Sequence, residues 1–314
     1  MIYTVNRKPM DERHLEVVSR PEKSSFDYKD VIVKKPWGYE YLVFENEHVA
    51  IWMLQIVRKR RTSMHCHRRK RTGLVLLSGE AQFHHLEGSI ALNRMNAVNV
   101  DASTFHSTEA ASLLPIQPVS EDGIWVLEIE TPPLKEDVCR MSDAYGRAGA
   151  TYEGVNQMVF EPSEILKLAA PEEGERLVRR TFQNLVFTVR KGAIGPRVVP
   201  RPEALVSVIG REPGTDSSNP FMEVGKVFSF GQFRENTREE DFEGVTTLTI
   251  EEEEKVVKIS DYIASTIADM GVRHVFAVCG GGAMHLVDSF GGCDRLDYIA
   301  THHEQAAAMA AEGY

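Results

Sequence analysis

The spacing of apolar runs constrains the fold of this chain more than any other feature, because that spacing changes once, near residue 259. Before this position the runs are strand-sized, separated by turn residues and without helical periodicity between them. Short strands at such spacing predict an antiparallel sandwich or barrel. After it, segments of helical period alternate with strand-sized runs, which is typical of a parallel α/β sheet. The sequence therefore predicts a mainly β protein followed by an α/β segment.

We expect five parts along the 314 residues. They are an N-terminal arm (1–30), a first β domain (31–150), a second β-rich domain (151–236), an acidic linker (237–258) and the α/β segment (259–314). The second β-rich domain is expected to be either a degenerate copy of the first or another β fold. Its strand-like runs are LVFTVRKG, ALVSVIGR and KVFSFGQF, and PSEILKLAA is expected to be a short helix. Two parallel strands cannot bury both of their faces, so the α/β segment is expected to be truncated.

Charge and composition restrict the partners of the chain. Asp plus Glu outnumber Lys plus Arg by 46 to 36, which gives a formal charge of −10 and argues against nucleic-acid binding. No apolar run approaches the ~20 residues that a membrane span needs, and the N-terminus lacks the apolar stretch of a secretory signal. The four cysteines show no CxxC spacing and are expected to be reduced thiols. We therefore expect a cytoplasmic protein that acts on small molecules.

Eight basic residues lie between positions 58 and 71 despite the negative net charge. Such a cluster attracts phosphate and carboxylate groups, so a sugar phosphate or a nucleotide-sugar is a candidate ligand. An alternative interpretation is a solvated strand edge whose charges deter aggregation. The side chains expected to hold a substrate phosphate are Arg61, Arg68, Arg69 and Lys70.

Three histidines in the first β domain form a candidate metal site. His65 and His67 are two residues apart, so their side chains point to one face of an extended strand. His106 follows in a run that is expected on a neighbouring strand. Three imidazoles suit a divalent transition metal (zinc, manganese or iron) with positions left open for substrate. The alternative is a group of hydrogen-bonded imidazoles in a polar barrel mouth.

Several segments around these histidines resemble a known family. KPWGYEYLV, TSMHCHRRKRTGLVLLSGEA and VDASTFHST look like the cupin barrel of type II mannose-6-phosphate isomerases. ETPPLKEDVCRMSDAYGRAG resembles the tail that follows that barrel in sugar-nucleotide and capsule-pathway proteins. The resemblance implies one cupin barrel, or two with the second degenerate. It also implies a role in carbohydrate or surface-polysaccharide precursor metabolism, and cupins commonly form homodimers.

The resemblance places the family's metal histidines on His65, His67 and His106, but its ligand glutamate falls on Thr72. A threonine hydroxyl is a poorer ligand than a carboxylate, so the site is expected to have a different charge and a lower affinity. Strand alternation allows only one of two adjacent histidines to face inward. The nearby residues that could compensate are His84, His85 and Glu87.

The activity implied by the resemblance is aldose–ketose isomerisation of a phosphorylated sugar. A metal would polarise the carbonyl and hydroxyl oxygens while a base moves a proton between adjacent carbons. The residues alone do not identify that base. Loss of the ligand glutamate leaves two alternatives open: a sugar-binding or regulatory cupin without turnover, and a metal-dependent cupin of another activity.

The last segment carries the run HHEQAAAMAAEGY after a helix, a strand, a glycine turn, a helix and a strand. In this order it resembles the start of the pyrimidine-binding domain of thiamine-diphosphate enzymes of the acetolactate-synthase type. The resemblance implies that Glu304 is the catalytic carboxyl that shares a proton with the aminopyrimidine ring of the cofactor. The alternative is that Glu304 only favours the first turn of its helix. The implied cofactor-binding residues are Gly280, Gly281, Gly282 and Glu304.

Thiamine diphosphate and its magnesium ion also require a second domain with a Gly-Asp-Gly…Asn motif, which does not occur in these residues. Thiamine chemistry is therefore expected only in a complete enzyme. Two functions remain. One is a cupin sugar-phosphate isomerase or sugar-nucleotide pathway protein fused to the start of a thiamine-diphosphate enzyme. The other is a non-catalytic, sugar-binding or regulatory cupin module of such an enzyme.

Overall fold

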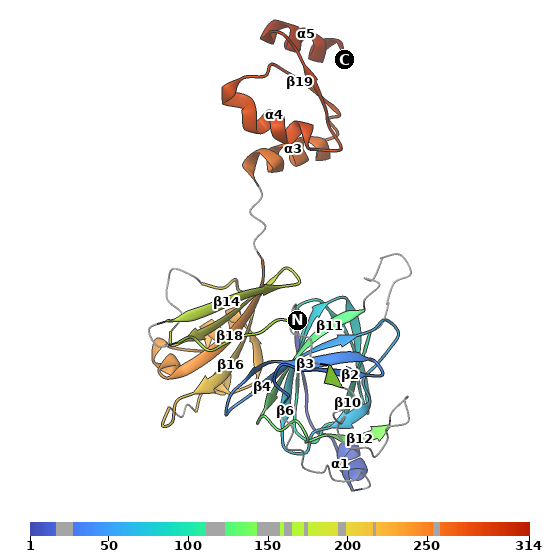
Figure 1. The fold of residues 1–314 in the computed structure, drawn as a ribbon, viewed down its shortest axis with the longest axis vertical. Coiled ribbons are helices and arrows are strands. Elements are labelled where there is room, and N and C mark those ends of the chain that lie inside the picture. Colours follow the sequence, from blue (N-terminus) through green and yellow to red (C-terminus); the bar gives the residue numbers. More distant parts are fainter. Residues whose placement is uncertain are drawn as a thin grey trace. The chain divides into compact units, whose positions relative to one another are not determined.

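The structure is a computed structural model, and it divides the chain into two compact units, Met1–Glu253 and Glu254–Tyr314 (Figure 1). The division falls close to the change in apolar spacing near residue 259. Each unit has an apolar core of its own. The residues that the structure describes are 1–16, 28–110, 123–142, 158–159, 165–172, 175–193, 199–215, 218–253 and 258–314.

Two facing β-sheets form a barrel in the first unit, which confirms the expected cupin barrel and the mainly β fold. The larger sheet contains, in spatial order, β1 (Ile2–Val5), β9 (Ala97–Val100), β6 (Arg71–Ser78), β11 (Ile124–Thr131), β4 (Ala50–Ile56), β3 (Gly38–Glu45), β2 (Ile32–Lys35) and β13 (Met158–Val159). The smaller sheet contains β12 (Cys139–Ser142), β5 (Met64–Cys66), β10 (His106–Ala110), β7 (Glu80–His85) and β8 (Gly88–Asn93).

The larger sheet is buried on both faces, and this explains why its strands are nearly continuous apolar runs. Leu74 and Leu76 of β6 belong to the core inside the barrel. Val75 and Leu77 of the same strand belong to a second core on the outer face of the sheet. Alternate side chains of a strand point to opposite faces, so both sets must be apolar when both faces are covered.

A third sheet covers that outer face, and its strands come from the second β-rich region and from the supposed linker that follows it. Its helices α2 (Phe230–Glu235), η2 (Pro220–Met222) and η3 (Glu239–Phe242) bury the opposite face. The described strands form one antiparallel sheet rather than a second barrel, so the region is the other β fold of the two that were expected. Its strands, in spatial order, are β14 (Leu177–Phe182), β15 (Leu185–Lys191), β18 (Val245–Glu252), β16 (Leu205–Arg211) and β17 (Val227–Ser229).

Three local expectations for this part of the chain are wrong. The run KVFSFGQF is a strand only over β17, because its last four residues begin α2. The supposed linker 237–258 contains β18, the central strand of the third sheet, which pairs with β15 and β16 and buries Leu248 and Ile250 in the outer core. In the run PSEILKLAA, the described part is not helical. Leu166 and Leu168 are both buried in the outer core, and the Leu168 N–H donates to the Val43 carbonyl at 3.0 Å. Apolar residues two apart suit this extended path better than a helix.

The N-terminal region is also more ordered than an arm through residue 16. Strand β1 pairs in parallel with β9 at the edge of the larger sheet, and α1 (Pro9–Leu15) follows it. Asp11 is buried, and its carboxylate accepts the N–H of Phe105 at 2.9 Å and of Lys8 at 2.8 Å. This carboxylate attaches the helix to the loop that leads into β10.

A buried asparagine joins the barrel to the third sheet, and its removal gives a first testable prediction. The Asn99 side chain donates to the Val227 carbonyl at 2.9 Å and accepts the Val227 N–H at 2.8 Å. Replacing Asn99 with alanine leaves both backbone groups without these partners, so we expect a loss of about 1–3 kcal/mol in unfolding free energy. Urea unfolding measures it, and the exposed Asn93→Ala variant is the matched control. Equal stability of the two variants would contradict the prediction.

The second unit has the predicted order of helices and strands. It contains α3 (Ile259–Asp269), β19 (His274–Ala277), η4 (Gly281–Ala283), α4 (Met284–Gly291), β20 (Asp297–Ala300) and α5 (Glu304–Gly313). Strands β19 and β20 pair in parallel, and Phe290 and Leu296 lie in the small core beside them. Within the described ranges of the chain, no helix combines the length and apolar character needed to cross a bilayer.

Candidate metal centre

The three predicted histidines converge on one point inside the barrel. His65 is on β5, His67 follows it, and His106 begins β10, where it is the direct antiparallel partner of His65. One ring nitrogen from each histidine lies within 4.8 Å of the other two. His67 and His106 are buried, and His65 is partly buried. Strand alternation and the β5–β10 register together bring these side chains to one place.

Backbone carbonyls orient all three imidazoles. The Nδ1 atoms contact the carbonyl oxygens of Ser63 at 2.7 Å for His65, Asp137 at 2.5 Å for His67 and Thr104 at 3.0 Å for His106. A carbonyl oxygen can only accept, so each Nδ1 carries the proton and each Nε2 keeps its lone pair. Among the described residues, the buried Nε2 atoms of His67 and His106 have no hydrogen-bond partner. Hydrogen bonds from Nδ1 to backbone carbonyls, with Nε2 left available, are typical of metal-binding histidines.

The surroundings keep these imidazoles neutral. Burial lowers the pKa of His65, His67 and His106 below the ordinary histidine value. The neighbouring His106 adds to this for His65, and the Lys70 ammonium adds to it for His67. A neutral imidazole is the form that binds a metal, so the donor set fits zinc, manganese or iron.

No carboxylate joins this histidine cluster among the described residues. Thr72 shares the inward face of β6 with Leu74. Its hydroxyl is buried and has no hydrogen-bond partner among the described residues. His84 contacts the Glu109 carboxylate at 2.8 Å. His85 and Glu87 are also outside the cluster. None of the three proposed substitutes for the missing ligand therefore takes its place.

A cavity of about 50 Å³ beside the histidines contains charged side chains that the sequence did not reveal. Lys70, fully buried, contacts Glu130 at 2.6 Å. Glu40 contacts Lys135 at 2.7 Å and Lys35 at 3.4 Å. The residues that line this cavity include Lys35, Glu40, Ser63, His65, His67, Glu128, Glu130, Lys135 and Arg140. This volume has room for a few water molecules or substrate oxygens beside a metal.

The segment after β11 lines one side of this cavity, and Asp137 holds that segment in place. The Asp137 carboxylate accepts backbone N–H groups of Arg68 at 3.2 Å, Arg69 at 2.8 Å and Lys70 at 3.1 Å. Its carbonyl accepts from His67. Asp137 therefore fixes the turn after β5 and one metal-site histidine together. Asp137 lies in the run ETPPLKEDVCR, but the spacing of the residues in this run does not predict its contacts.

Replacing Asp137 with asparagine is therefore expected to weaken metal binding. The amide has one oxygen in place of two, so part of the N–H cluster loses its acceptor and His67 loses its fixed position. We expect affinity for zinc to fall by about 10–100-fold, which is the usual effect of disturbing a hydrogen-bond partner of a metal-binding side chain. Calorimetric titration of the apoprotein with zinc measures it. Asp294→Asn, at an exposed position, should bind as wild type; equal affinities of the two variants would disprove the role of Asp137.

The four residues expected to hold a phosphate do not form one site. Lys70 is inside the barrel with Glu130. The Arg68 guanidinium donates to the Leu15 carbonyl at 2.7 Å and to the Cys139 sulfur at 3.3 Å. Arg61 and Arg69 are exposed. Strand β5 and the turn after it lie between Arg61 and Lys70 and separate these side chains although they are close in the sequence.

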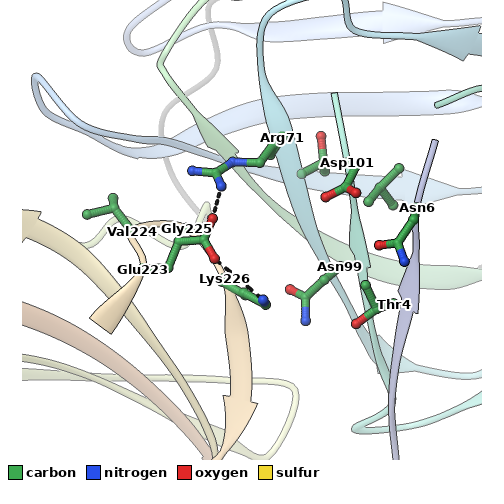
Figure 2. Close-up of a pocket in the computed structure, with 11 residues that line it drawn as sticks. Thr4, Asn6, Arg71, Asn99, Asp101, Glu223, Val224, Gly225 and Lys226 are labelled. Carbon is green, nitrogen blue, oxygen red and sulfur yellow. Dashed lines mark hydrogen bonds and ion pairs between the residues drawn. The ribbon is translucent and has the colours of Figure 1, made fainter. Parts of the chain in front are cut away.

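Arg71, the last member of the basic run, faces a different cavity, of about 70 Å³, between the barrel and the third sheet. Figure 2 shows its ion pair with Glu223, which also contacts Lys226 at 3.4 Å. Asn99 and Thr4 lie on the opposite side of this cavity (Figure 2). Arg71 therefore contributes to the contact between the two sheets and not to the histidine site.

In the second unit, the expected cofactor-binding residues lie at one edge of the parallel pair. Gly280, Gly281 and Gly282 follow β19, and Glu304 follows β20 as the first residue of α5. The carboxyl ends of parallel strands meet at the same edge, where α/β proteins bind ligands. A Cβ atom added to any of these glycines would meet nothing within 4 Å. Glu304 is exposed rather than partly buried, so this unit supplies the edge but not the enclosure that its proposed proton sharing needs.

Comparison with protein families agrees with the interpretation of this second unit. Residues 257–314 match the family described as "Thiamine pyrophosphate enzyme, N-terminal TPP binding domain". A comparison with curated proteins found no match.

Several solved structures are similar to part of this chain at low sequence identity. KdgF from Halomonas sp. is 15% identical, covers 36% of this chain and 94% of its own, and has a TM-score of 0.28. An RmlC-like cupin from Shewanella frigidimarina is 16% identical; the match covers 38% of this chain and 96% of that cupin, with a TM-score of 0.28. A putative sugar phosphate isomerase from Acidithiobacillus ferrooxidans is 17% identical; the match covers 27% of this chain and 50% of that protein, with a TM-score of 0.22.

The barrel topology, the histidine cluster and the family match together describe the domain organisation of the chain. It joins a cupin barrel, extended by a third β-sheet, to a segment that matches the N-terminal TPP-binding domain of thiamine pyrophosphate enzymes.

Proposed function

We propose that the cupin barrel is a metal-dependent isomerase of a phosphorylated sugar of the mannose 6-phosphate type. The observation that carries this proposal is the convergence of three neutral imidazoles whose Nδ1 atoms are fixed by backbone carbonyls. A divalent metal held by His65, His67 and His106 would polarise the carbonyl and hydroxyl oxygens of an aldose or ketose. The chain's own side chains then have to bind the substrate and move its proton.

The cavity beside the histidines supplies groups for both tasks. Lys35, Lys135 and Arg140 are cations that line it, and they are better placed for a substrate phosphate than the exposed Arg61 and Arg69. Carboxyl groups line the same cavity and can exchange protons with the substrate. Neighbouring strands bury these groups, which limits the access of bulk water to the site.

Metal analysis and an isomerase assay test this proposal. The purified full chain is expected to contain a divalent metal and to interconvert mannose 6-phosphate and fructose 6-phosphate, and chelation should abolish turnover. His65→Ala should lose both the metal and the activity. Metal-free protein without turnover, indistinguishable from its His65→Ala variant, would support instead the non-catalytic sugar-binding module.

Other expectations from the sequence remain predictions. They are a sugar-phosphate or nucleotide-sugar partner, a homodimer, a cytoplasmic location and a role in polysaccharide precursor metabolism. For the second unit we propose that the edge formed by Gly280–Gly282 and Glu304 binds thiamine diphosphate when a diphosphate-binding domain with magnesium completes it.

A further inference from the structure

Two carboxyl groups, Glu128 and Glu130, lie beside the metal-site histidines on the inward face of one strand. They are two residues apart on β11, both are buried, and both line the cavity with His65 and His67. Glu130 is the direct cross-strand partner of Thr72.

Glu130 forms a buried ion pair with Lys70 through one carboxylate oxygen, and its other oxygen remains for further chemistry. Its Oε1 atom contacts the Lys70 ammonium at 2.6 Å, and both side chains are almost fully buried. Its Oε2 atom is buried and has no hydrogen-bond partner among the described residues. An unpartnered carboxylate oxygen in a buried site is costly unless a ligand uses it. Such an oxygen has the lone pair that a general base requires.

The environment of Glu128 is the opposite of that of Glu130. Its cross-strand neighbours are Trp52 on β4 and Leu74 on β6, which are apolar. Burial, and then the Glu130 carboxylate, raise the pKa of Glu128 to about 8, so it carries a proton at neutral pH. The charged groups that act on it most are Glu130 on its own strand, Lys135 on the following segment, Glu40 on β3 and Lys70 before β6, and Lys35 on β2 and Arg140 on β12 line the same cavity.

We propose that Glu130 is the base and Glu128 the acid of the isomerisation, an inference that rests on the proposed function. Glu130 takes the proton from the carbon next to the substrate carbonyl, and the electron pair of that C–H bond forms a C=C bond. The carbonyl oxygen accepts the Glu128 proton, which gives an enediol. Glu130 then returns its proton to the adjacent carbon, and Glu128 recovers one from the other hydroxyl, so protons and electrons balance. Two carboxyls with opposite protonation states are the usual arrangement for such roles.

Substitution of the base tests its role directly. With mannose 6-phosphate as the probe, Glu130→Gln should lower kcat by about 10²–10⁴-fold and stop incorporation of solvent deuterium at C2. Its zinc content should stay that of wild type, because Glu130 is not one of the clustered ligands. Glu130→Asp keeps the charge next to Lys70 and should fold and retain part of the activity. The exposed Glu87→Gln should behave as wild type.

Two outcomes of this experiment would overturn the assignment of Glu130. Loss of zinc from Glu130→Gln with normal folding would make Glu130 a metal ligand instead of the base. Full turnover by Glu130→Gln or by Glu128→Gln would exclude the pair from proton transfer while leaving the proposed isomerase intact. A wild-type protein with bound zinc and no turnover would overturn the proposed function itself, and the inference with it.

A measurement of stability against pH tests the acid without any turnover. A folded-state pKa near 8 and an unfolded value of 4.5 mean that the folded protein binds one more proton between these values. The folding equilibrium constant of wild type should therefore fall, relative to Glu128→Gln, by about tenfold for each pH unit in that window. The ratio should be constant above the window. A ratio that stays flat from pH 5 to 8 would show that Glu128 is ionised, and would overturn its role as the acid.

Discussion

Replacement of His106 with alanine is expected to remove the metal from the barrel. His106 is buried, its Nδ1 is fixed by the Thr104 carbonyl, and its Nε2 has no hydrogen-bond partner among the described residues. Two imidazoles alone make a weak site for a divalent metal. Affinity for zinc should therefore fall by more than about 100-fold. This is a larger loss than the removal of a ligand's hydrogen-bond partner causes. Elemental analysis and calorimetric titration of the purified full chain measure this.

A second histidine provides the matched control for this experiment. His84 lies on β7, next to the strand of His106, but its ring contacts Glu109 and is not part of the cluster. His84→Ala should therefore retain wild-type zinc content and affinity. If His106→Ala binds zinc as tightly as His84→Ala, the three histidines are not the metal ligands, and both the proposed isomerase and its acid–base pair lose their basis.

Replacement of Lys70 with methionine is expected to destabilise the first unit by about 3–5 kcal/mol, because a buried charge loses its partner. Lys70 and Glu130 have side chains that are 0% and 2% exposed, and their charged atoms are 2.6 Å apart. Without the ammonium group, the Glu130 carboxylate must either remain buried as an unpaired charge or take up a proton. Chemical unfolding of the full chain, followed by a probe of the first unit such as Trp52 fluorescence, measures the loss.

The double variant Lys70→Met with Glu130→Leu separates the charge effect from a packing defect. With both charges removed, stability should return to the wild-type value or exceed it, since buried ion pairs can often be replaced by apolar side chains without loss. The exposed Lys59→Met should change stability by less than about 0.5 kcal/mol. A double variant as unstable as Lys70→Met alone would mean that packing of the lysine stem, and not the ion pair, causes the loss.

The histidine cluster could be predicted from the sequence because it depends on local rules. Side chains two residues apart on a strand lie on the same face of the sheet, and this brings His65 and His67 together. The third histidine, His106, required only that its run be the neighbouring strand, which β10 is. In the second unit, Gly280 and Glu304 were implied by the family resemblance, and the structure places them in the two segments that follow the strands of a parallel pair.

The basic run shows where local rules fail. Arg68, Lys70 and Arg71 are neighbours in the sequence, yet they contact α1, the barrel interior and the third sheet in turn. The partner of Lys70 is Glu130, which lies sixty residues away. Whether a lysine is solvated or buried depends on whether such a partner reaches it, because an unpaired ammonium group is too costly to bury. Composition cannot supply that information.

The supposed linker fails for a related reason. The acidic residues 251–254 suggested solvated chain, but β18 ends among them, at Glu252, after a run whose buried side chains complete the third sheet. A strand of eight residues between two others is stabilised by its neighbours and not by its own composition. The side chain that joins this sheet to the barrel, Asn99, is likewise polar and gives no sign of its role in the sequence.

The sequence by itself determined the two fold classes and the three histidines, since these follow from strand or helix period, and it implied Glu304 through the family resemblance. Only the tertiary structure decided that Glu128 and Glu130 lie beside those histidines, that Lys70 is inside the barrel, and that Asp137 fixes the cavity. These contacts join strands and segments distant in the chain, and the strand pairing that creates them also determines which charges are buried together. Protonation state and chemistry depend on that burial, so they follow from the assembled barrel and not from any stretch of its sequence.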